Sequence, residues 1–300
     1  MIITHNPTRL AVIIINWNQA HLTCTCVQRI INNIQTAKTN IVYQIIVVDN
    51  GSTDNSATMI SEQFPSIILI GLSHNQGFAK GVNCALRHPA CNDTDLCLFI
   101  NNDAYLAENA LDRLLDSITN DSSDIVSPII YTDMSSGHLW SAGSMIGKHT
   151  LRNINNRPSS RAMKSAITCD MVTFCIVLVP YAVFMQVGML DESFFMYYED
   201  WDFCLRSKQY GIRLQVNPNA VGYHAVAAST GGRWSSAERF LNGKSLIHFY
   251  RKNMRFASPF FASVYLIVYV VAYCVRMMLS KKLSATRAFL LGIWQGITET

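Results

Sequence analysis

The feature that most constrains the fold of this chain is a set of short apolar runs that each end in polar residues. The clearest is residues 96–100, five apolar residues followed by Asn101, Asn102 and Asp103. A run of this length with Phe and Ile predicts a buried β-strand. Open α/β sheets bind ligands beyond the carboxyl ends of their strands, so the position of Asp103 suits a metal or phosphate site. Taken alone, such a triplet is more often a strand that ends in an Asx turn.

Three more apolar runs repeat this pattern earlier in the chain. Residues 11–15, 45–48 and 67–70 each predict a short strand, and apolar residues at helical spacing over 22–34 predict a helix between the first two. Strand, helix and strand in this order predict a right-handed βαβ unit, the beginning of a nucleotide-binding half. All four predicted strands end in Asn, Asp or Gly. This favours a shared ligand crevice over four unrelated turns.

Two polar loops follow strands in this half. After the second strand, Asp49 has the position from which a carboxylate accepts hydrogen bonds from a base or ribose, although an isolated Asp there is more often only a cap. Gly51 permits a tight turn, and Asp54 is one of the residues that can cap the next helix. After the third strand, Gly77 and Gly81 let the backbone approach a ligand, and the helix that opens there has N-terminal amides that suit phosphate.

The second half is less regular. Residues 125–130 and 170–179 are apolar and predict strands. Residues 131–165 between them are polar and rich in Gly, Ser, Asn and Arg, so we expect a mobile excursion there.

An acidic cluster begins the next predicted helix, which Gly211 would end. Its three carboxylates, Glu199, Asp200 and Asp202, lie within four positions and beside several aromatic residues. On a helix, Glu199 and Asp202 share one face while Asp200 points elsewhere. Negative charge at a helix N-terminus is stabilised by the helix dipole, so a structural role and a catalytic role fit equally well. A hydrolase that pairs Glu199 with Asp202 would leave the nucleotide-like first half unexplained.

Composition narrows the class of protein. The chain has 300 residues, of which 50% are hydrophobic and 15% charged, which allows a sizeable core and excludes disorder as the main state. The formal charge is +4 and the basic residues are scattered, so no nucleic-acid footprint is expected. Nine cysteines without CxxC pairs predict reduced thiols in a cytosolic compartment rather than structural zinc. The first ten residues do not predict a secretory signal.

A hydrophobic segment lies near the C-terminus. Residues 259–279 are almost all apolar, and about 20 such residues suffice to span a bilayer core. Basic residues flank both ends, for example Arg255 and Lys281, so an in-plane segment or a hairpin fits as well as a single span. A buried core helix is the alternative. We expect residues 251–300 to be a membrane-associating tail that holds the protein at the cytoplasmic face of the inner membrane.

Four motifs in order resemble family 2 glycosyltransferases of the GT-A fold, and most closely the rhamnosyltransferase-type enzymes that build bacterial surface polysaccharides. They are VDNGSTD ending at Asp54, NQGFAKGVN ending at Asn83, NND ending at Asp103 and YEDWD ending at Asp202. The resemblance runs from about residue 10 to about residue 224. It implies an α/β fold with a Rossmann-like, mostly parallel sheet flanked by helices. Residues 1–250 would form the catalytic domain, with a nucleotide-binding half over about 10–104 and an acceptor half over about 105–250.

The resemblance also implies roles for individual residues. Asp49 matches the aspartate that binds the uracil or thymine ring, and Asp103 matches the last residue of the DxD motif, which holds a divalent cation such as Mg²⁺ or Mn²⁺ against the diphosphate. Asp200, beside Glu199, matches the catalytic base, and His224 resembles a late histidine of the metal or diphosphate site. The other residues expected on the nucleotide side are Asn16, Asp54, Asn75, Gly77, Lys80, Asn83 and Asn102.

The chain departs from the family pattern at two positions. Asn101 replaces the first aspartate of the DxD motif, which removes one charged metal ligand. Phe174 stands where similar enzymes have a small residue, and it would change the acceptor pocket. Two further residues, Arg233 and Trp234, could clamp phosphate and stack on a sugar or base, or could be surface residues.

The implied activity is that of an inverting, metal-dependent glycosyltransferase. Its donor would be a dTDP- or UDP-sugar such as dTDP-rhamnose, and its acceptor a lipid-linked cell-surface glycan at the membrane surface. The alternatives are a catalytically silent glycan- or nucleotide-binding protein at the membrane, and another nucleotide-dependent α/β transferase.

Overall fold

The apolar runs predicted from the sequence form neighbouring strands of one sheet. The computed structural model describes residues 7–118, 124–132, 137–156, 165–225 and 234–299. Within these residues the sheet has ten strands, in the order β10-β12-β6-β11-β4-β1-β2-β3, with β5 paired to β12 and β7 to β6. They are β1 (Thr8–Asn16), β2 (Ile41–Asp49), β3 (Ile68–Gly71), β4 (Leu96–Ile100), β5 (Ala104–Leu106), β6 (Ile125–Tyr131), β7 (Leu139–Ser141), β10 (Ile167–Cys169), β11 (Ile176–Pro180) and β12 (Leu214–His224).

The long strands share one direction. β3, β2, β1, β4, β6 and β12 run parallel to one another, and β11 lies antiparallel between β4 and β6. This confirms the predicted Rossmann-like, mostly parallel sheet. The register of β1 with β2 places Asn16 opposite Asp49. The carboxyl ends of the strands in the first half therefore meet at one edge of the sheet.

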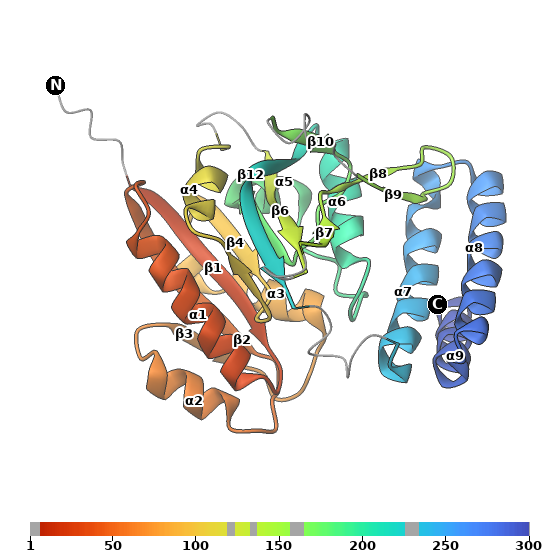
Figure 1. Cartoon of the computed structure of the whole chain (residues 1–300), viewed down its shortest axis with the longest axis horizontal. Helices are drawn as coiled ribbons and strands as arrows, with labels where there is room; N and C mark the ends of the chain where they lie inside the picture. The colour runs from red at the N-terminus through yellow and green to blue at the C-terminus, as the bar shows by residue number, and fades with distance from the viewer. Residues whose placement is uncertain (1–6, 119–123, 133–136, 157–164, 226–233, 300) are drawn as a thin grey trace.

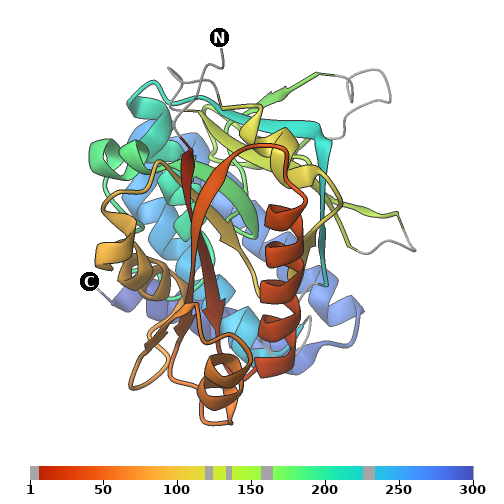
Figure 2. The ribbon, with the colours of Figure 1, turned by 90° about the vertical axis from the view of Figure 1, so that its left-hand side faces the viewer.

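Helices cover both faces of this sheet. The alternating side chains of β1 divide between two cores: Val12 packs with α1 and α4, whereas Ile13 packs with α3, α5 and α6. Figures 1 and 2 show α1 on one side of the sheet and the C-terminal helices on the far side. The helices are α1 (Ala20–Gln35), α2 (Ser56–Gln63), α3 (Phe78–Leu86), α4 (Ala110–Leu115), α5 (Tyr181–Val187) and α6 (Glu199–Gln209).

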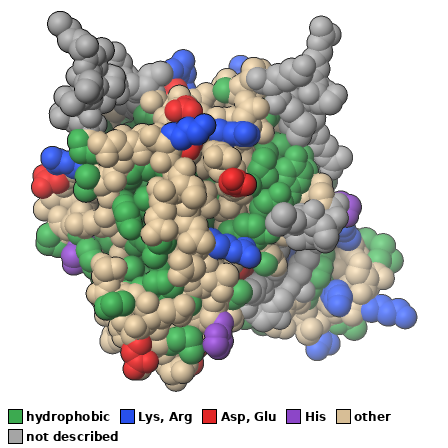
Figure 3. All heavy atoms as spheres, turned by 60° about the vertical axis from the view of Figure 1, so that its left-hand side comes forward, with side chains coloured by type: hydrophobic (Ala, Val, Ile, Leu, Met, Phe, Trp, Pro, Cys, Tyr) green, Lys and Arg blue, Asp and Glu red, His purple; other side chains and the backbone are tan. Residues whose placement is uncertain are grey.

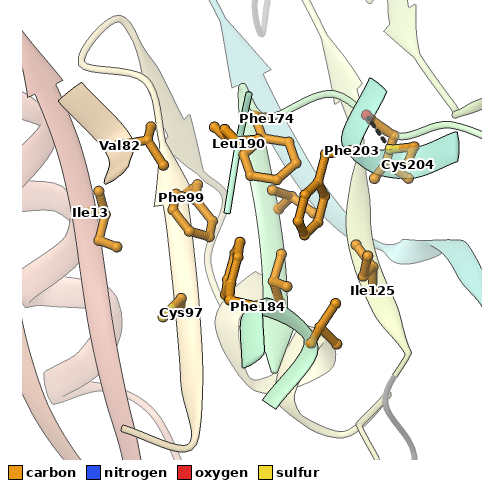
Figure 4. Packing of buried hydrophobic residues seen from close by; sticks show 14 of the residues in the cluster. Ile13, Val82, Cys97, Phe99, Ile125, Phe174, Phe184, Leu190, Phe203 and Cys204 are labelled. Atoms are coloured by element: carbon orange, nitrogen blue, oxygen red, sulfur yellow. Dashed lines mark hydrogen bonds between the residues drawn. The ribbon is translucent and has the colours of Figure 1, made fainter. Parts of the chain in front are cut away.

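Aromatic side chains fill the second of these cores. The ring of Phe99 lies 5.0 Å from that of Phe174 and 5.6 Å from that of Phe184, and Phe203 packs against both Phe174 and Phe184 (Figure 4). Burying one such side chain stabilises the fold by about 1.5–3 kcal/mol. This core fixes α6, and with it the acidic cluster, against the sheet. α6 ends before Gly211, whose φ of 75° confirms the predicted stop signal.

The structure differs from the sequence prediction between residues 131 and 179. The predicted strand over 170–179 begins only at Ile176, because residues 171–175 leave the sheet to line a cleft. The predicted polar excursion contains β7 and a two-stranded hairpin of β8 (Ser144–Ile146) and β9 (Asn153–Asn155). Its residues 133–136 and 157–164 lie outside the described part of the chain.

Three long helices form the C-terminal part: α7 (Ser236–Asn253), α8 (Pro259–Leu279) and α9 (Leu283–Thr298). α7 and α9 cross closely at glycines, because a Cβ on Gly292 would lie 2.1 Å from the carbonyl oxygen of Phe240 and one on Gly243 would lie 2.4 Å from that of Phe289. Figure 1 shows the three helices side by side at one end of the molecule. α7 runs across residue 250, where we expected the catalytic domain to end, and that division stays a prediction.

α8 coincides with the apolar segment expected from the sequence. By length and composition alone it could cross a membrane, and only 17% of its most apolar 18-residue stretch is buried in the protein. One side carries Ala262 and Met277 into a core shared with α7 and α9. The other side exposes large apolar side chains, including Ile267 at 64% and Val268 at 60%.

Charged side chains of both signs are scattered over the described part of the face that Figure 3 shows. Over the described part of the face in Figure 3, Lys and Arg side chains occur in small separate groups among acidic and uncharged ones.

Candidate active site

A cleft of about 540 Å³ opens at the carboxyl edge of the strands. Its walls come from both halves of the chain. Residues that line it from the first half are Ile15, Trp17, Asn50, Asn75, Phe78 and Asn101–Asp103. Those from the second half are Trp140, Ser141, Ser144, Asn153, Asn155, Met171–Cys175, Met196–Trp201, His224 and Asn242.

Asp103 and His224 meet in this cleft because β4 and β12 end beside each other. The pairing of β12 with β5 sets His224 opposite Ala104, and the N–H of Ala225 donates to the carbonyl of Asp103 at 2.9 Å. As a result, Oδ1 of Asp103 lies 3.1 Å from Nε2 of His224, with both side chains buried. Nδ1 of His224 has no hydrogen-bond partner among the described residues. The ring of Trp140 packs edge-on against the imidazole at 4.5 Å.

A chain of buried polar side chains joins the strand ends. Asn102 Nδ2 donates to Oγ1 of Thr23 at 3.0 Å, Thr23 Oγ1 donates to Oδ1 of Asn16 at 2.7 Å, and Asn16 Nδ2 donates to Oδ1 of Asp49 at 2.8 Å. Buried polar networks rigidify a site when every member is satisfied. Asn16 and Asn102 therefore hold Asp49 and the Asp103 loop at a fixed separation.

The two nucleotide-side loops are tied to each other and to the second half. Nδ2 of Asn50 donates to the carbonyl of Gly77 at 3.0 Å, and its Oδ1 accepts from the N–H of Gln76 at 2.9 Å. Gly77 has a φ of 87°, and a Cβ there would lie 2.2 Å from the carbonyl oxygen of Phe195. Only glycine fits this crossing point. Asn50, which the sequence analysis did not select, thus holds the predicted Gly77 loop in place.

Of the eight residues expected on the nucleotide side, Asn75 and Asn102 line the cleft and the other six do not. Asn16, Asp49 and Gly77 belong to the polar network and loops described above, and Asp54, Lys80 and Asn83 make contacts elsewhere. Asn83 is buried and exchanges hydrogen bonds with the backbone of Leu190 at 2.8 and 3.1 Å. Asp54 accepts from the N–H of Ser56 at 3.0 Å at the start of α2. Lys80 lines a separate hollow beside β3. The contacts of Asn83 and Asp54 are those of structural residues.

The acidic pair stands at the N-terminus of α6 on a strained turn. Tyr197 and Tyr198 both have left-handed backbones, with φ of 71° and 69°, a conformation that costs about 1–3 kcal/mol for a side chain of this size. The ring of Tyr198 packs 5.0 Å from Trp201 and 5.4 Å from Phe249, which holds the turn in place. This turn directs Glu199 and its neighbour Asp200 toward the cleft.

Both acids of this pair have raised pKa values. Burial raises the pKa of Asp200 from 3.8 to about 6, although hydrogen bonds from the backbone of Trp201 and Phe174 and from the side chain of Thr173 partly oppose the change. Burial and the charge of Asp200 raise the pKa of Glu199 well above its ordinary value. Oε2 of Glu199 has no partner among the described residues. A half-buried carboxylate with a pKa near neutrality is suited to accept a proton.

Asp202 faces away from the cleft. Its carboxylate is fully buried and accepts from Nε of Arg206 at 2.8 Å and from Nζ of Lys252 at 2.9 Å. The bond from Lys252 ties α6 to α7. The helix therefore turns Glu199 and Asp200 to the cleft together, and the pairing of Glu199 with Asp202 that a hydrolase would need is not formed.

Two aromatic residues singled out from the sequence lie in packed positions. Phe174 is 2% exposed and its ring sits in the core of Figure 4, although the residue is also part of the cleft lining. Trp234 stacks on Tyr273 at 5.9 Å in the C-terminal helices and does not line the cleft. Arg233 lies outside the described residues.

Several aromatic and amide residues that complete the walls were not among the predicted site residues. Trp17 follows β1 directly, and its place at a strand end was a usable signal. Trp140, Asn153 and Asn155 come from the polar excursion, where no periodic pattern marked them. Within the described chain, no group of three or more His, Cys, Asp and Glu side chains converges to hold a metal ion.

Comparison with known sequences identifies relatives. The profile of the family described as glycosyl transferase family 2 matches residues 11–182. The chain is 27% identical over 183 residues to dTDP-rhamnosyl transferase RfbF of Shigella flexneri, over 61% of this chain and 60% of RfbF. It is 26% identical over 209 residues to the N-acetylglucosaminyl-diphospho-decaprenol L-rhamnosyltransferase of Mycobacterium tuberculosis, over 62% of this chain and 68% of that protein. The match thus spans less than two thirds of the length of RfbF.

Solved structures share the fold. The chain superposes on GalNAc-T7 with UDP, GalNAc and Mn²⁺ with a TM-score of 0.61 and 14% identity, over 82% of this chain and 50% of that one. It superposes on the mannosyltransferase PcManGT of Pyrobaculum calidifontis, in complex with GDP-Man and Mn²⁺, with a TM-score of 0.59 and 14% identity, over 98% of this chain and 88% of that one. These similarities confirm the predicted GT-A fold.

Proposed function

Since this chain belongs to glycosyl transferase family 2, we propose that it transfers a sugar from a nucleotide-diphosphate donor to a hydroxyl group of a lipid-linked surface glycan, with inversion at the anomeric carbon. The observation that carries the proposal is that Asp103 and Asp200, which lie almost 100 positions apart, line one cleft. dTDP-rhamnose is the favoured donor, because RfbF is a dTDP-rhamnosyl transferase. A UDP-sugar is the alternative.

Asp200 is the proposed general base. In a single displacement the acceptor hydroxyl loses its proton as it attacks the anomeric carbon and the diphosphate leaves on the other face. A base with a pKa of about 6 is ionised at neutral pH and still basic enough to take that proton. Such a group accelerates a reaction by roughly 10²–10⁴. Burial and the charge of Asp200 raise the pKa of Glu199, so this end of the cleft disfavours a second negative charge.

Asp103 and His224 would hold a divalent cation. A carboxylate oxygen and an imidazole nitrogen 3.1 Å apart fit one edge of a coordination shell, and the unpartnered Nδ1 shows that the structure leaves His224 incompletely bonded. Mg²⁺ and Mn²⁺ sites commonly use one or two protein ligands and take the rest from phosphate oxygens and water. Bound there, the cation would neutralise the leaving diphosphate. Asn101 would contribute at most a neutral amide oxygen.

We also propose that the exposed apolar side of α8 rests in a membrane surface. A helix whose other side packs on the protein, and whose exposed side carries Ile267, Val268 and Val271, suits insertion parallel to the membrane. Basic residues at both ends would contact anionic headgroups. Replacing these three residues by Ser should shift the protein from anionic phospholipid vesicles to the supernatant on sedimentation, and unchanged sedimentation would contradict the proposal.

The activity is tested with purified protein, Mn²⁺ and a panel of dTDP- and UDP-sugars. We expect one donor to be hydrolysed slowly and to be transferred to an N-acetylglucosaminyl-diphospho-lipid acceptor, as the name of the M. tuberculosis relative suggests. The variant Asp200→Asn should bind the donor nucleotide but lose turnover, whereas Glu62→Gln, which changes an exposed acid on α2, should behave like the unaltered protein. Binding without turnover in the unaltered protein would favour the silent glycan- or nucleotide-binding alternative.

A further inference from the structure

We propose that the cleft face of the β8–β9 hairpin is the binding site for the terminal sugar of the acceptor. The inference rests on the proposed function, because it assigns the second substrate of the same cleft. It adds the residues that recognise this sugar, Ser144, Asn153 and Asn155, none of which belongs to the four motifs found in the sequence.

The hairpin turns its polar side chains mainly to one face. β8 and β9 pair antiparallel with Ser144 opposite Asn155 and Met145 opposite Ile154. Because side chains alternate along a strand, Ser144, Asn153 and Asn155 share the face that lines the cleft. Met145 and Ile154 lie on the other face, where they are 39% and 47% exposed.

The polar face carries hydrogen-bonding groups suited to sugar hydroxyls. Oδ1 of Asn153 is buried and has no partner among the described residues, and buried polar atoms are rarely left without one. Its amide can accept from one hydroxyl and donate to the next, which matches vicinal hydroxyls of a sugar ring. Trp140, at the same wall, offers an aromatic surface for the apolar side of such a ring.

The hairpin is hydrogen-bonded to the segment that holds the proposed base. The N–H of Ser144 donates to the carbonyl of Met171 at 2.9 Å, and the N–H of Met171 donates to the carbonyl of Ser144 at 3.0 Å. Two and three residues later, Thr173 and Phe174 donate to the carboxylate of Asp200. A sugar held by the hairpin would thus have a fixed position relative to Asp200.

The hairpin is also anchored to the C-terminal helices. Its Leu151 is 1% exposed in the core of α7, α8 and α9, and the hydroxyl of Tyr250 donates to the carbonyl of Thr150 at 3.0 Å. Figure 1 shows the hairpin reaching from the region of α6 toward α7 and α8. The site is therefore held by packed elements on both sides, as a specific binding site requires.

The test is sugar binding by the full chain in detergent, measured by saturation-transfer NMR with free L-rhamnose, N-acetylglucosamine, galactose and mannose, with and without dTDP or UDP. We expect at least one sugar to bind. The variants Asn153→Leu and Ser144→Ala should weaken that binding by about tenfold, as the loss of one hydrogen bond implies. Met145→Ala, on the opposite face of the same hairpin, should leave it unchanged. Thermal midpoints confirm that each variant is folded.

Two results would overturn the assignment: no sugar of the panel binds the unaltered protein, or Asn153→Leu binds it as well as Met145→Ala does. With a working transfer assay, Asn153→Leu should raise the KM for the acceptor about tenfold and leave the KM for the donor and its hydrolysis unchanged. The proposed function fails separately, if no nucleotide sugar is bound or consumed. In that case, sugar binding that depends on Asn153 would still support the assignment of the hairpin as a sugar site.

Discussion

Replacing Asp200 by Asn should abolish turnover and at the same time stabilise the folded protein at neutral and alkaline pH. The two effects have one cause, which is the burial of an ionisable carboxyl group beside the cleft. Burial raises the pKa of Asp200 to about 6. This value makes the group an effective base, and it also means that the folded state holds the ionised form at a cost.

The cost follows from the pKa. Each pKa unit corresponds to about 1.4 kcal/mol, so a rise from 3.8 to about 6 destabilises the folded protein by about 3 kcal/mol once the group is ionised. Well below pH 3.8 the group is protonated in both states and contributes nothing. Between pH 4 and 6 the unfolded chain releases the proton while the folded protein keeps it, so stability falls as pH rises. Above pH 6 the full cost is present.

The assay is urea unfolding of the unaltered protein and of Asp200→Asn in detergent from pH 4 to pH 8. The variant should have nearly the same free energy of unfolding at pH 4 and should be more stable by up to about 3 kcal/mol at pH 8. The variant also removes the charge of Asp200, which helps to raise the pKa of Glu199. The pKa of Glu199 should therefore fall, which stabilises the folded protein further. In the unaltered protein, kcat should rise with pH through about 6 and then level off.

A stability difference that does not change with pH would refute this reasoning, because it would show that Asp200 is not ionised at a cost in the folded state. Equal turnover by Asp200→Asn would refute its role as base. Glu62→Gln is the control, since an exposed acid on α2 should change stability by no more than about 0.5 kcal/mol.

Three further predictions concern the elements around the cleft. Lys252→Met leaves the fully buried Asp202 without its second cation and should cost about 3 kcal/mol in urea unfolding. Lys208→Met breaks a pair whose lysine side chain is 42% exposed and should cost less than about 1 kcal/mol. Equal costs would contradict the role of Lys252 in joining α6 to α7. Gly292→Val places a side chain against the backbone of Phe240 and should lower the free energy of unfolding by about 2 kcal/mol. Proteases should then cleave near α9 at a lower temperature. An unchanged melting temperature would show that α7 and α9 can move apart there at no cost. Excess EDTA should stop transfer and Mn²⁺ should restore it, and full activity in EDTA would exclude the proposed cation.

Several parts of the site could be predicted from the sequence because they depend on local pattern. A short apolar run that ends in polar residues specifies both a strand and the edge where its last residues lie. Asp103 and Asn16 were found in this way, and the structure brings them to one edge of the sheet. The apolar segment at 259–279 was predicted with the bounds of α8, since Pro at a helix start and a continuous apolar run are local signals.

Other parts could not be predicted, because they depend on which neighbour each side chain meets. Asn83 belongs to a motif that resembles a nucleotide site, yet packing of α3 against the loop at Leu190 turns its amide to structural bonds. Helical spacing grouped Glu199 with Asp202, whereas the cleft groups Glu199 with Asp200. The strained turn at Tyr198, held by aromatic packing from α7, is the physical reason for that difference.

The sequence by itself determined the class of sheet, the edge that carries the site and one of the acids that line the cleft, Asp103, because hydrophobic periodicity and strand-end chemistry act over a few residues. Only the tertiary structure decided which acid pairs with Lys252, which loops stay outside the cleft, and that a polar hairpin far along the chain forms its wall. Those outcomes depend on contacts between segments that are distant in sequence, and no local pattern encodes such contacts.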